Sequence, residues 1–239
     1  MLRALDQQGL RDDTLVFFTS DNGPALTPMH PHGSAGPLRA KKAHLYEGGI
    51  RVPGLIRWPG RITPGTVSGE PMSGVDVLPT LCAIAGIAVP SDRRIDGANI
   101  LPLIAGKPVP RTTPLYWQYN RAQSPPKVAM RIGDWKILAR LDTPNPPNPP
   151  SITEESQRAF KASELTSYEL YNLRDDIVEA RDLAAQEPVR LKGMIATLQA
   201  LHHEVRDESP TWPAWPFSNY DAPRIVWPPY WKAGAPKKN

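Results

Sequence analysis

The 239-residue sequence is poor in cysteine, in long apolar runs and in clustered charge. Its single cysteine, Cys82, cannot form an internal disulfide, so cysteine usage does not identify the redox compartment. No run approaches the ~20 apolar residues that a membrane-spanning helix requires. Lys and Arg number 28 against 24 Asp and Glu, without a basic block, so we expect neither a membrane span nor a nucleic-acid partner.

Proline, by contrast, is abundant: the chain has 29 prolines, about twice the average usage of ~5%. Residues 142–153 (DTPNPPNPPSIT) are expected to be an exposed excursion without regular structure, because proline lacks the backbone N–H that helices and sheets need. Residues 208–239 form a Trp/Pro-rich tail with four of the seven tryptophans, which we expect to wrap across a surface.

The rest of the chain predicts two portions, residues 1–110 with alternating helix and strand patterns and residues 111–207 with more strands. In the first portion we expect a helix at 2–8 ended by Gly9, a strand at 14–19 covered on both faces and a loop at 24–42. We expect these to be followed by a strand within 50–60 and a helix at 76–85 before Gly86. In the second portion we expect a strand at 113–120, a hairpin over 128–141 around Gly133 and Asp134, a strand at 168–173 and an amphipathic helix at 187–205.

Polar residues stand where the first strand ends. Asp21 and Asn22 follow the apolar run at 14–19, and ligands of open, mainly parallel sheets gather at the carboxyl ends of strands. Carboxylate and amide oxygens suit calcium or magnesium better than zinc. The alternative is an Asp-Asn-Gly turn that only ends the strand. Lys42 is a compact positive charge suited to an anionic ester, with a solvated surface lysine as the alternative.

The order of the motifs is more specific than any one of them. The chain contains, in sequence, TSDNGP, LRAKKAHLYEGGIRVP, RWPGRI, VDVLPTLCAIAGI, IDGANILPLIAG, RIGDWKIL and ELYNLRDDIVEARDLA. This series resembles the C-terminal half of a type I sulfatase of the arylsulfatase group, within the alkaline-phosphatase-like superfamily. The resemblance implies an α/β fold: the C-terminal part of the sulfatase sandwich (1–110) and a small antiparallel sheet with one packed helix (111–207).

The resemblance also implies roles for individual residues. Asp21 and Asn22 would ligate a divalent cation, usually Ca²⁺, and Lys42 would contact the sulfate, with Lys41 as the rival if the register slips by one. His44 lies near enough in sequence to contact a substrate, with a solvated loop histidine as the alternative. Glu47 and Arg51 are interpreted as structural partners around the YEGG turn, whose glycines let the backbone pass close to the site.

The sequence departs from the family at the nucleophile. Such enzymes oxidise a Cys or Ser within Cys/Ser-x-Pro/Ala-x-Arg to formylglycine, and neither Cys82 nor any serine here has that context. The first two aspartates of the metal site are also missing, and two protein oxygens do not complete a calcium site of six to eight ligands. The sequence also starts at Met1 in helical spacing without a signal-peptide layout. We therefore expect a truncated sulfatase, inactive alone, whose missing N-terminal half supplies the nucleophile.

The function expected of the parent protein is hydrolysis of sulfate monoesters, on a small molecule or a sulfated carbohydrate, in the periplasm or outside the cell. Two alternatives stay open: a phosphoester hydrolase of the same superfamily, and a non-catalytic binding protein that keeps the C-terminal fold. The other polar candidates are interpreted without a role in a functional site. His30 and His32 lack a third metal ligand, His202 and His203 are adjacent and cannot face one site, and Asp76 is interpreted as a helix cap.

Overall fold

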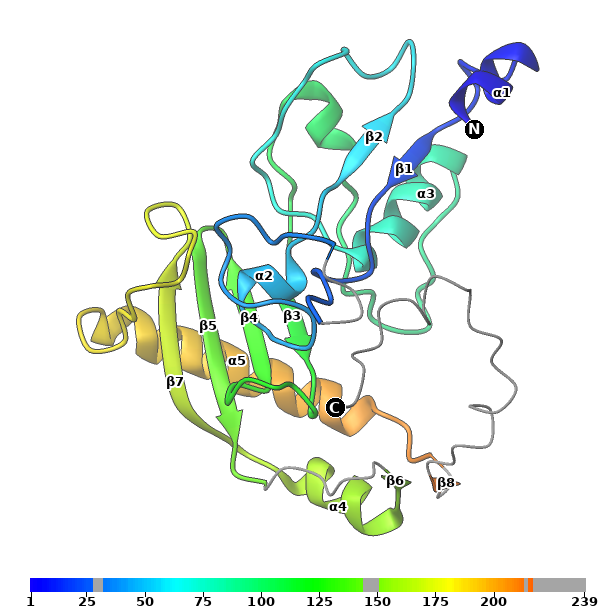
Figure 1. Ribbon diagram of the computed structural model, residues 1–239. Helices are drawn as coiled ribbons and strands as arrows, with labels where there is room; N and C mark the ends of the chain where they lie inside the picture. Colours follow the sequence, from blue (N-terminus) through cyan, green and yellow to red (C-terminus); the bar gives the residue numbers. More distant parts are fainter. Residues whose placement is uncertain (28–31, 144–150, 213–214, 217–239) are drawn as a thin grey trace, which may run out of the picture. The chain divides into compact units, whose positions relative to one another are not determined.

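The computed structural model describes residues 1–27, 32–143, 151–212 and 215–216 (Figure 1). It divides into two compact units, the first made of residues 1–21, 52–116 and 130–134 and the second of residues 22–51, 117–129 and 135–239. Mixed helices and antiparallel sheets agree with the expected α/β class. The boundaries proposed at residues 110 and 207 stay predictions.

The first unit opens with a short helix and a two-stranded sheet. Helix α1 (Leu2–Gln7) ends before Gly9, which has a left-handed φ of +70° as expected. Strand β1 (Val16–Phe18) pairs antiparallel with β2 (Leu55–Arg57). The expectation that the first strand is covered on both faces is wrong for the described residues, because Phe18 is 58% exposed and β2 is the only described strand beside it.

Helix α3 (Val77–Ala85) follows a 3₁₀ turn, η1 (Gly74–Asp76), and ends at Gly86 with φ +67°, as its sequence predicts. Cys82 is 4% exposed and therefore lies in the core. A second 3₁₀ turn, η2 (Leu101–Ala105), completes the unit. The core cluster next to these turns contains Ala98, Ile100 and Val109, with Ile56, Met72 and Leu103 packed against it.

Asp76 caps the start of the helical segment, as predicted, and also forms a buried ion pair. Its side chain forms a capping box with Ser73 at the start of η1, which leads into α3, and it is fully buried. Its two oxygens accept from the Arg111 guanidinium at 2.8 and 2.7 Å, and its carboxylate also accepts from the backbone N–H groups of Ser73 and Ala98, each at 2.8 Å. Asp76 therefore ties the start of η1 to segments 22 and 35 residues away.

Replacing Arg111 with methionine is expected to destabilise the first unit by about 3–5 kcal/mol, because a fully buried carboxylate then keeps its charge without its cation. The urea midpoint of unfolding measures this loss. Arg93→Met is the matched control, since Arg93 pairs with Asp92 on an exposed surface. Equal midpoints for the two variants would contradict a structural role for the buried pair.

A four-stranded sheet with the order β3-β4-β5-β7 carries the rest of the fold. Its strands are β3 (Leu115–Gln118), β4 (Val128–Ile132), β5 (Trp135–Leu141) and β7 (Leu165–Asn172). The predicted hairpin turns at Gly133, which has φ +56°. Strands β5 and β7 pair antiparallel from Trp135↔Asn172 to Leu141↔Leu165, with a register shift at Ala139/Arg140.

Helix α5 (Pro188–Glu208) covers one face of this sheet, and the segment with the short helix α2 (Glu47–Ile50) lies over the other (Figure 1). The α5 side chains that become buried are Met194, Leu198, Leu201 and His202. Since side chains alternate along a strand, Lys136 and Leu138 of β5 point to the α2 side together.

One helix was missed from the sequence. Helix α4 (Glu154–Ala162) has only three apolar residues, Ala159, Phe160 and Ala162, but Thr153 and Ser156 form a capping box at its start. The predicted excursion at 142–153 contains a short strand, β6 (Ser151–Ile152), paired with β8 (Trp215–Pro216). Residues 144–150 and most of the predicted wrapping tail lie outside the described residues.

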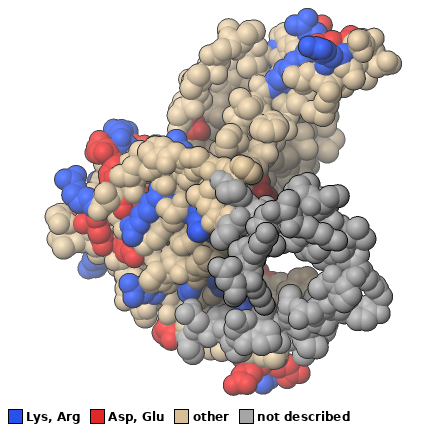
Figure 2. Space-filling view, viewed as in Figure 1, with Lys and Arg blue, Asp and Glu red and all other residues tan. Residues whose placement is uncertain are grey.

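None of the helices in the described ranges has both the length and the apolar character needed to cross a bilayer. Lys and Arg side chains lie interspersed with Asp and Glu over the viewed face of the second unit (Figure 2).

Candidate functional site

The backbone after Asn22 is hydrogen-bonded to the Lys42 segment. The Gly23 N–H donates to the Gly49 carbonyl at 2.9 Å, and the Lys42 N–H donates to the Pro24 carbonyl at 3.1 Å. Asn22 is half-buried and Lys42 is exposed. Asp21 is exposed and accepts from the Ser20 hydroxyl; it precedes Asn22 by one peptide bond and ends the first segment of the first unit.

The two neighbouring lysines have different surroundings. The Lys41 ammonium donates to the Leu26 carbonyl at 2.8 Å, so it holds the preceding loop. The described residues offer the Lys42 ammonium no hydrogen-bond partner or ion pair. An ammonium without such a contact is open to an incoming anion.

The backbone around the lysines is strained. Ala40 and Ala43 have φ of +66° and +70°, in the left-handed region that residues with a side chain rarely adopt. His44 braces the same turn, because its Nδ1 lies 3.1 Å from the carbonyl oxygens of both Lys41 and Lys42. Carbonyl oxygens only accept, so Nδ1 carries the proton in this arrangement. Strain of this type concentrates at functional sites and requires support from the surrounding structure.

Three glycines allow the segments to pass at close range, as expected for the YEGG turn. A Cβ on Gly23 would lie 1.9 Å from the Gly48 carbonyl oxygen, and one on Gly49 would lie 2.1 Å from the His44 oxygen. A Cβ on Gly48 would meet the carbonyl oxygens of Arg39 and Ala40, both at 2.4 Å. All of these neighbours are backbone atoms, which cannot rotate away.

A buried ion triad holds the YEGG turn on the sheet. The fully buried Lys136 ammonium lies 2.8 Å from Glu47 Oε1 and 2.9 Å from Glu179 Oε1. Glu179 Oε2 also accepts from the Glu47 N–H at 2.6 Å. Burial raises the pKa of Glu179, and the Lys136 charge opposes that rise. Glu47 further lies 3.7 Å from Arg51, which confirms their expected structural pairing.

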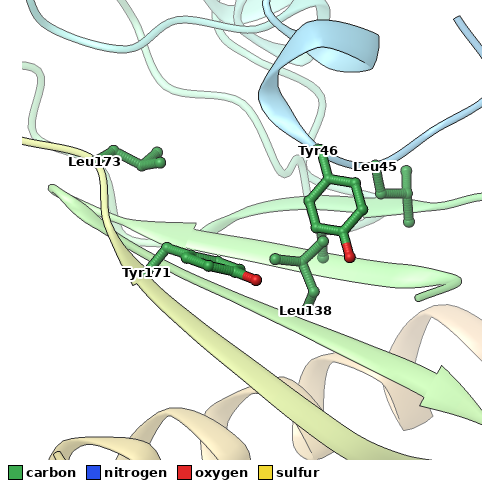
Figure 3. Packing of buried hydrophobic residues seen from close by; sticks show 6 residues of the cluster. Leu45, Tyr46, Leu138, Tyr171 and Leu173 are labelled. Carbon is green, nitrogen blue, oxygen red and sulfur yellow. The ribbon is translucent and has the colours of Figure 1, made fainter. Parts of the chain in front are cut away.

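An aromatic layer lies beside the triad. The Arg39 guanidinium stacks 3.7 Å from the centroid of Tyr46 and donates to the Tyr171 hydroxyl and the Glu179 carbonyl. Both tyrosine hydroxyls donate to Glu169 at 2.9 Å, and burial raises the pKa of each. Figure 3 shows the packed cluster around them, which includes Leu45, Leu138 and Leu173.

Sequence reasoning identified neither the triad nor the Arg39 contacts. The available signal was Lys136 itself, a charged residue at a core-facing position of an apolar strand, which predicts a buried partner. Its partners could not be named, because Glu47 lies 89 residues away in the chain.

The remaining polar candidates do not form a second site. His30 lies outside the described residues and His32 is exposed. His202 is buried, and burial lowers its pKa, whereas His203 faces outward and pairs with Glu164 at 3.0 Å. The described residues contain no group of three His, Cys, Asp or Glu side chains that could hold a metal ion. Asp21 and Asn22 match calcium in donor type, but they are two of the six to eight oxygens it requires.

Comparisons with known proteins agree on one family. The family model for "Sulfatase" matches residues 1–87. Steryl-sulfatase from Rattus norvegicus is 48% identical over 111 residues, covering 44% of this chain and 19% of that protein. Arylsulfatase A from Bos taurus is 35% identical over 211 residues, covering 84% of this chain and 41% of that protein.

A solved structure gives the same result for the fold. The structure of Ps i-CgsB in complex with k-i-k-neocarrahexaose matches with a TM-score of 0.68 and 26% identity, covering 88% of this chain and 41% of that one. The chain therefore spans less than half of the length of each of these three proteins.

Proposed function

Because this chain belongs to the sulfatase family, we propose that it provides the anion-contacting and part of the cation-contacting region of a site that hydrolyses sulfate monoesters. The observation that carries the proposal is the Lys42 segment. It presents an ammonium without a partner among the described residues, on a strained turn hydrogen-bonded to the backbone beside Asn22. Such a turn can hold a charge in place for a bound anion.

Each residue then has a proposed task. Lys42 binds the anionic oxygens of the sulfate ester and offsets the negative charge that develops on them. Lys41 and His44 orient the turn rather than the substrate, because their polar atoms are engaged with carbonyl groups. Asp21 and Asn22 would hold Ca²⁺ together with ligands that this sequence does not contain. When bound, the ion would act as a Lewis acid on the ester oxygens.

The attacking group lies outside this sequence in our proposal. A formylglycine would come from the Cys/Ser-x-Pro/Ala-x-Arg motif of a longer parent protein, and the chain by itself is inactive. The substrates proposed are sulfate esters of small molecules or of carbohydrates, and the proposed location is the periplasm or the exterior of the cell. Incubating the purified chain with an arylsulfate chromophore and calcium tests the inactivity, and release above buffer would refute it.

Lys42→Ala in the parent enzyme is expected to lower kcat/KM for a sulfate ester by about 10²–10³-fold, the usual effect of removing one charge-stabilising donor. Turnover of a chromogenic arylsulfate measures the loss. Lys41→Ala is the matched control and is expected to affect stability more than turnover, because its ammonium holds the Leu26 carbonyl. The opposite ranking, in folded variants, would assign the anion contact to Lys41.

The same assay separates the rival functions. Faster turnover of a phosphate ester than of the matching sulfate ester would favour a phosphoester hydrolase. Absence of turnover with both esters, in a calcium-loaded parent that has a verified nucleophile, would favour a binding protein. Loss of turnover on chelation is expected if the Asp21 and Asn22 oxygens hold a cation.

A further inference from the structure

A pocket of about 500 Å³ lies in the second unit, formed by the end of β3, helix α4 and the last turns of α5. This volume is within the range of small-molecule sites. Its walls combine aromatic, amide and basic side chains. The lining residues used below are Gln118, Tyr119, Arg121, Gln157, Lys161 and Trp212.

The charge of the pocket has one sign. The described lining includes Arg121, Lys161 and Arg206 but no aspartate or glutamate. Lys161 donates to the Ser209 carbonyl, which leaves its positive charge uncompensated, and Arg121 is exposed. Arg206 is partly neutralised by Glu164 at 2.9 Å. Two uncompensated cations therefore face a ligand, which favours an anion.

The aromatic side chains of the pocket are exposed. Trp212 is 63% and Tyr119 43% exposed, so their rings are open to a ligand. The Gln157 side-chain amide fixes the backbone of Trp212: it donates to the Trp212 carbonyl at 2.8 Å and accepts from the Trp212 backbone N–H at 2.6 Å. Gln118 donates to Asn120 at 2.8 Å, so this amide is ordered as well. Preorganised groups lose less entropy on binding.

A loop with internal hydrogen bonds joins the pocket to the Lys42 segment. The Gln123 N–H donates to the Ala43 carbonyl at 2.8 Å, next to Lys42. Arg121 lies two residues earlier, at most about 7 Å along the chain. The Lys127 ammonium donates to the carbonyls of Ala122 and Ser124, which braces the loop from within. One loop thus contributes to the pocket at one end and contacts the candidate site at the other.

From these features we propose that the pocket is a carbohydrate subsite, which binds an anionic, sulfated sugar residue of an oligosaccharide whose neighbouring unit reaches Lys42. Aromatic faces suit the apolar faces of sugar rings, amides suit hydroxyl groups, and Arg121 and Lys161 suit a sulfate. The inference rests on the proposed function, because that function places the neighbouring sugar unit at Lys42. The binding that it predicts, however, involves residues remote in sequence from Lys42.

The test is calorimetric titration of the full 239-residue chain with sulfated neocarrahexaose, its desulfated counterpart and inorganic sulfate. We expect saturable binding of the sulfated hexasaccharide, about tenfold weaker binding of the desulfated one, and no saturation with inorganic sulfate in the same range. Trp212→Ala and Arg121→Ala are each expected to weaken binding about tenfold. Lys192→Ala, which removes an exposed charge from α5, should leave affinity unchanged.

Several results would overturn the subsite. These are no saturable binding of the sulfated hexasaccharide, equal affinity for the desulfated one, or unchanged affinity in Trp212→Ala and Arg121→Ala. Circular dichroism of each variant separates lost binding from lost folding. Failure of the proposed function would be seen in a different measurement, as unchanged turnover of the parent enzyme with Lys42→Ala. That result would not change the conclusion of the binding experiment.

Discussion

Lys136→Met is expected to lower the free energy of unfolding of the second unit by about 3–5 kcal/mol, because it leaves two buried carboxylates side by side without their cation. Glu47 and Glu179 are 2% and 0% exposed, so water cannot replace the ammonium without opening the core. The methionine fills most of the lysine volume, which keeps a packing cavity from accounting for the loss.

The loss is also expected to depend on pH. Burial raises the pKa of Glu179 above its ordinary value of 4.5, and Lys136 opposes that rise. A carboxyl group with a raised pKa stabilises the folded state fully below its unfolded pKa, and this contribution disappears as the pH rises through the folded pKa. Without Lys136 the folded pKa rises further, so the deficit relative to wild type should be smaller near pH 4 than near pH 8.

Urea unfolding followed by tryptophan fluorescence at both pH values measures the deficit. Lys192→Met on the exposed surface of α5 is the matched control and should change the midpoint little at either pH. A Lys136→Met deficit that equals the control, or that grows as the pH falls, would show that the triad does not hold the YEGG turn on the sheet.

Gly49→Ala is expected to cost about 3 kcal/mol or more, at the upper end of overpacking effects, because the new Cβ would lie 2.1 Å from the His44 carbonyl oxygen and 2.6 Å from that of Lys41. Backbone atoms on both sides prevent relief by a rotamer change. The same substitution pushes against the turn that carries Lys42 and against the Gly23–Gly49 hydrogen bond. We therefore expect loss of turnover in the parent enzyme together with loss of stability.

Thermal unfolding of the chain and arylsulfate turnover of the parent measure the two effects. Gly193→Ala in α5 provides the control, since nothing lies within 4 Å of its Cβ and alanine favours a helix interior by about 1 kcal/mol. A Gly49→Ala chain as stable as the Gly193→Ala chain would mean that the close backbone passage is absent in solution.

Local signals predicted several elements well. Helix α3 before Gly86 and the hairpin around Gly133 depend on apolar spacing and on glycines with left-handed φ, both of which are visible within about ten residues. Helix α4 escaped prediction because only three of its nine residues are apolar. The order of the motifs carried the family, and the roles of Asp21, Asn22 and Lys42 follow from that resemblance and stay predictions.

Local patterns and the order of the motifs were thus sufficient to predict the turns, most of the helices and strands, and the sulfatase family. Which charges meet follows only from the folded arrangement of the chain. Asp76 binds Arg111 in addition to capping η1, Lys136 joins two glutamates, and Lys41 rather than Lys42 is held by a carbonyl group. The reason is physical: element formation depends on neighbours within a few residues, whereas burial of a charge depends on partners that only the folded chain brings within 3 Å.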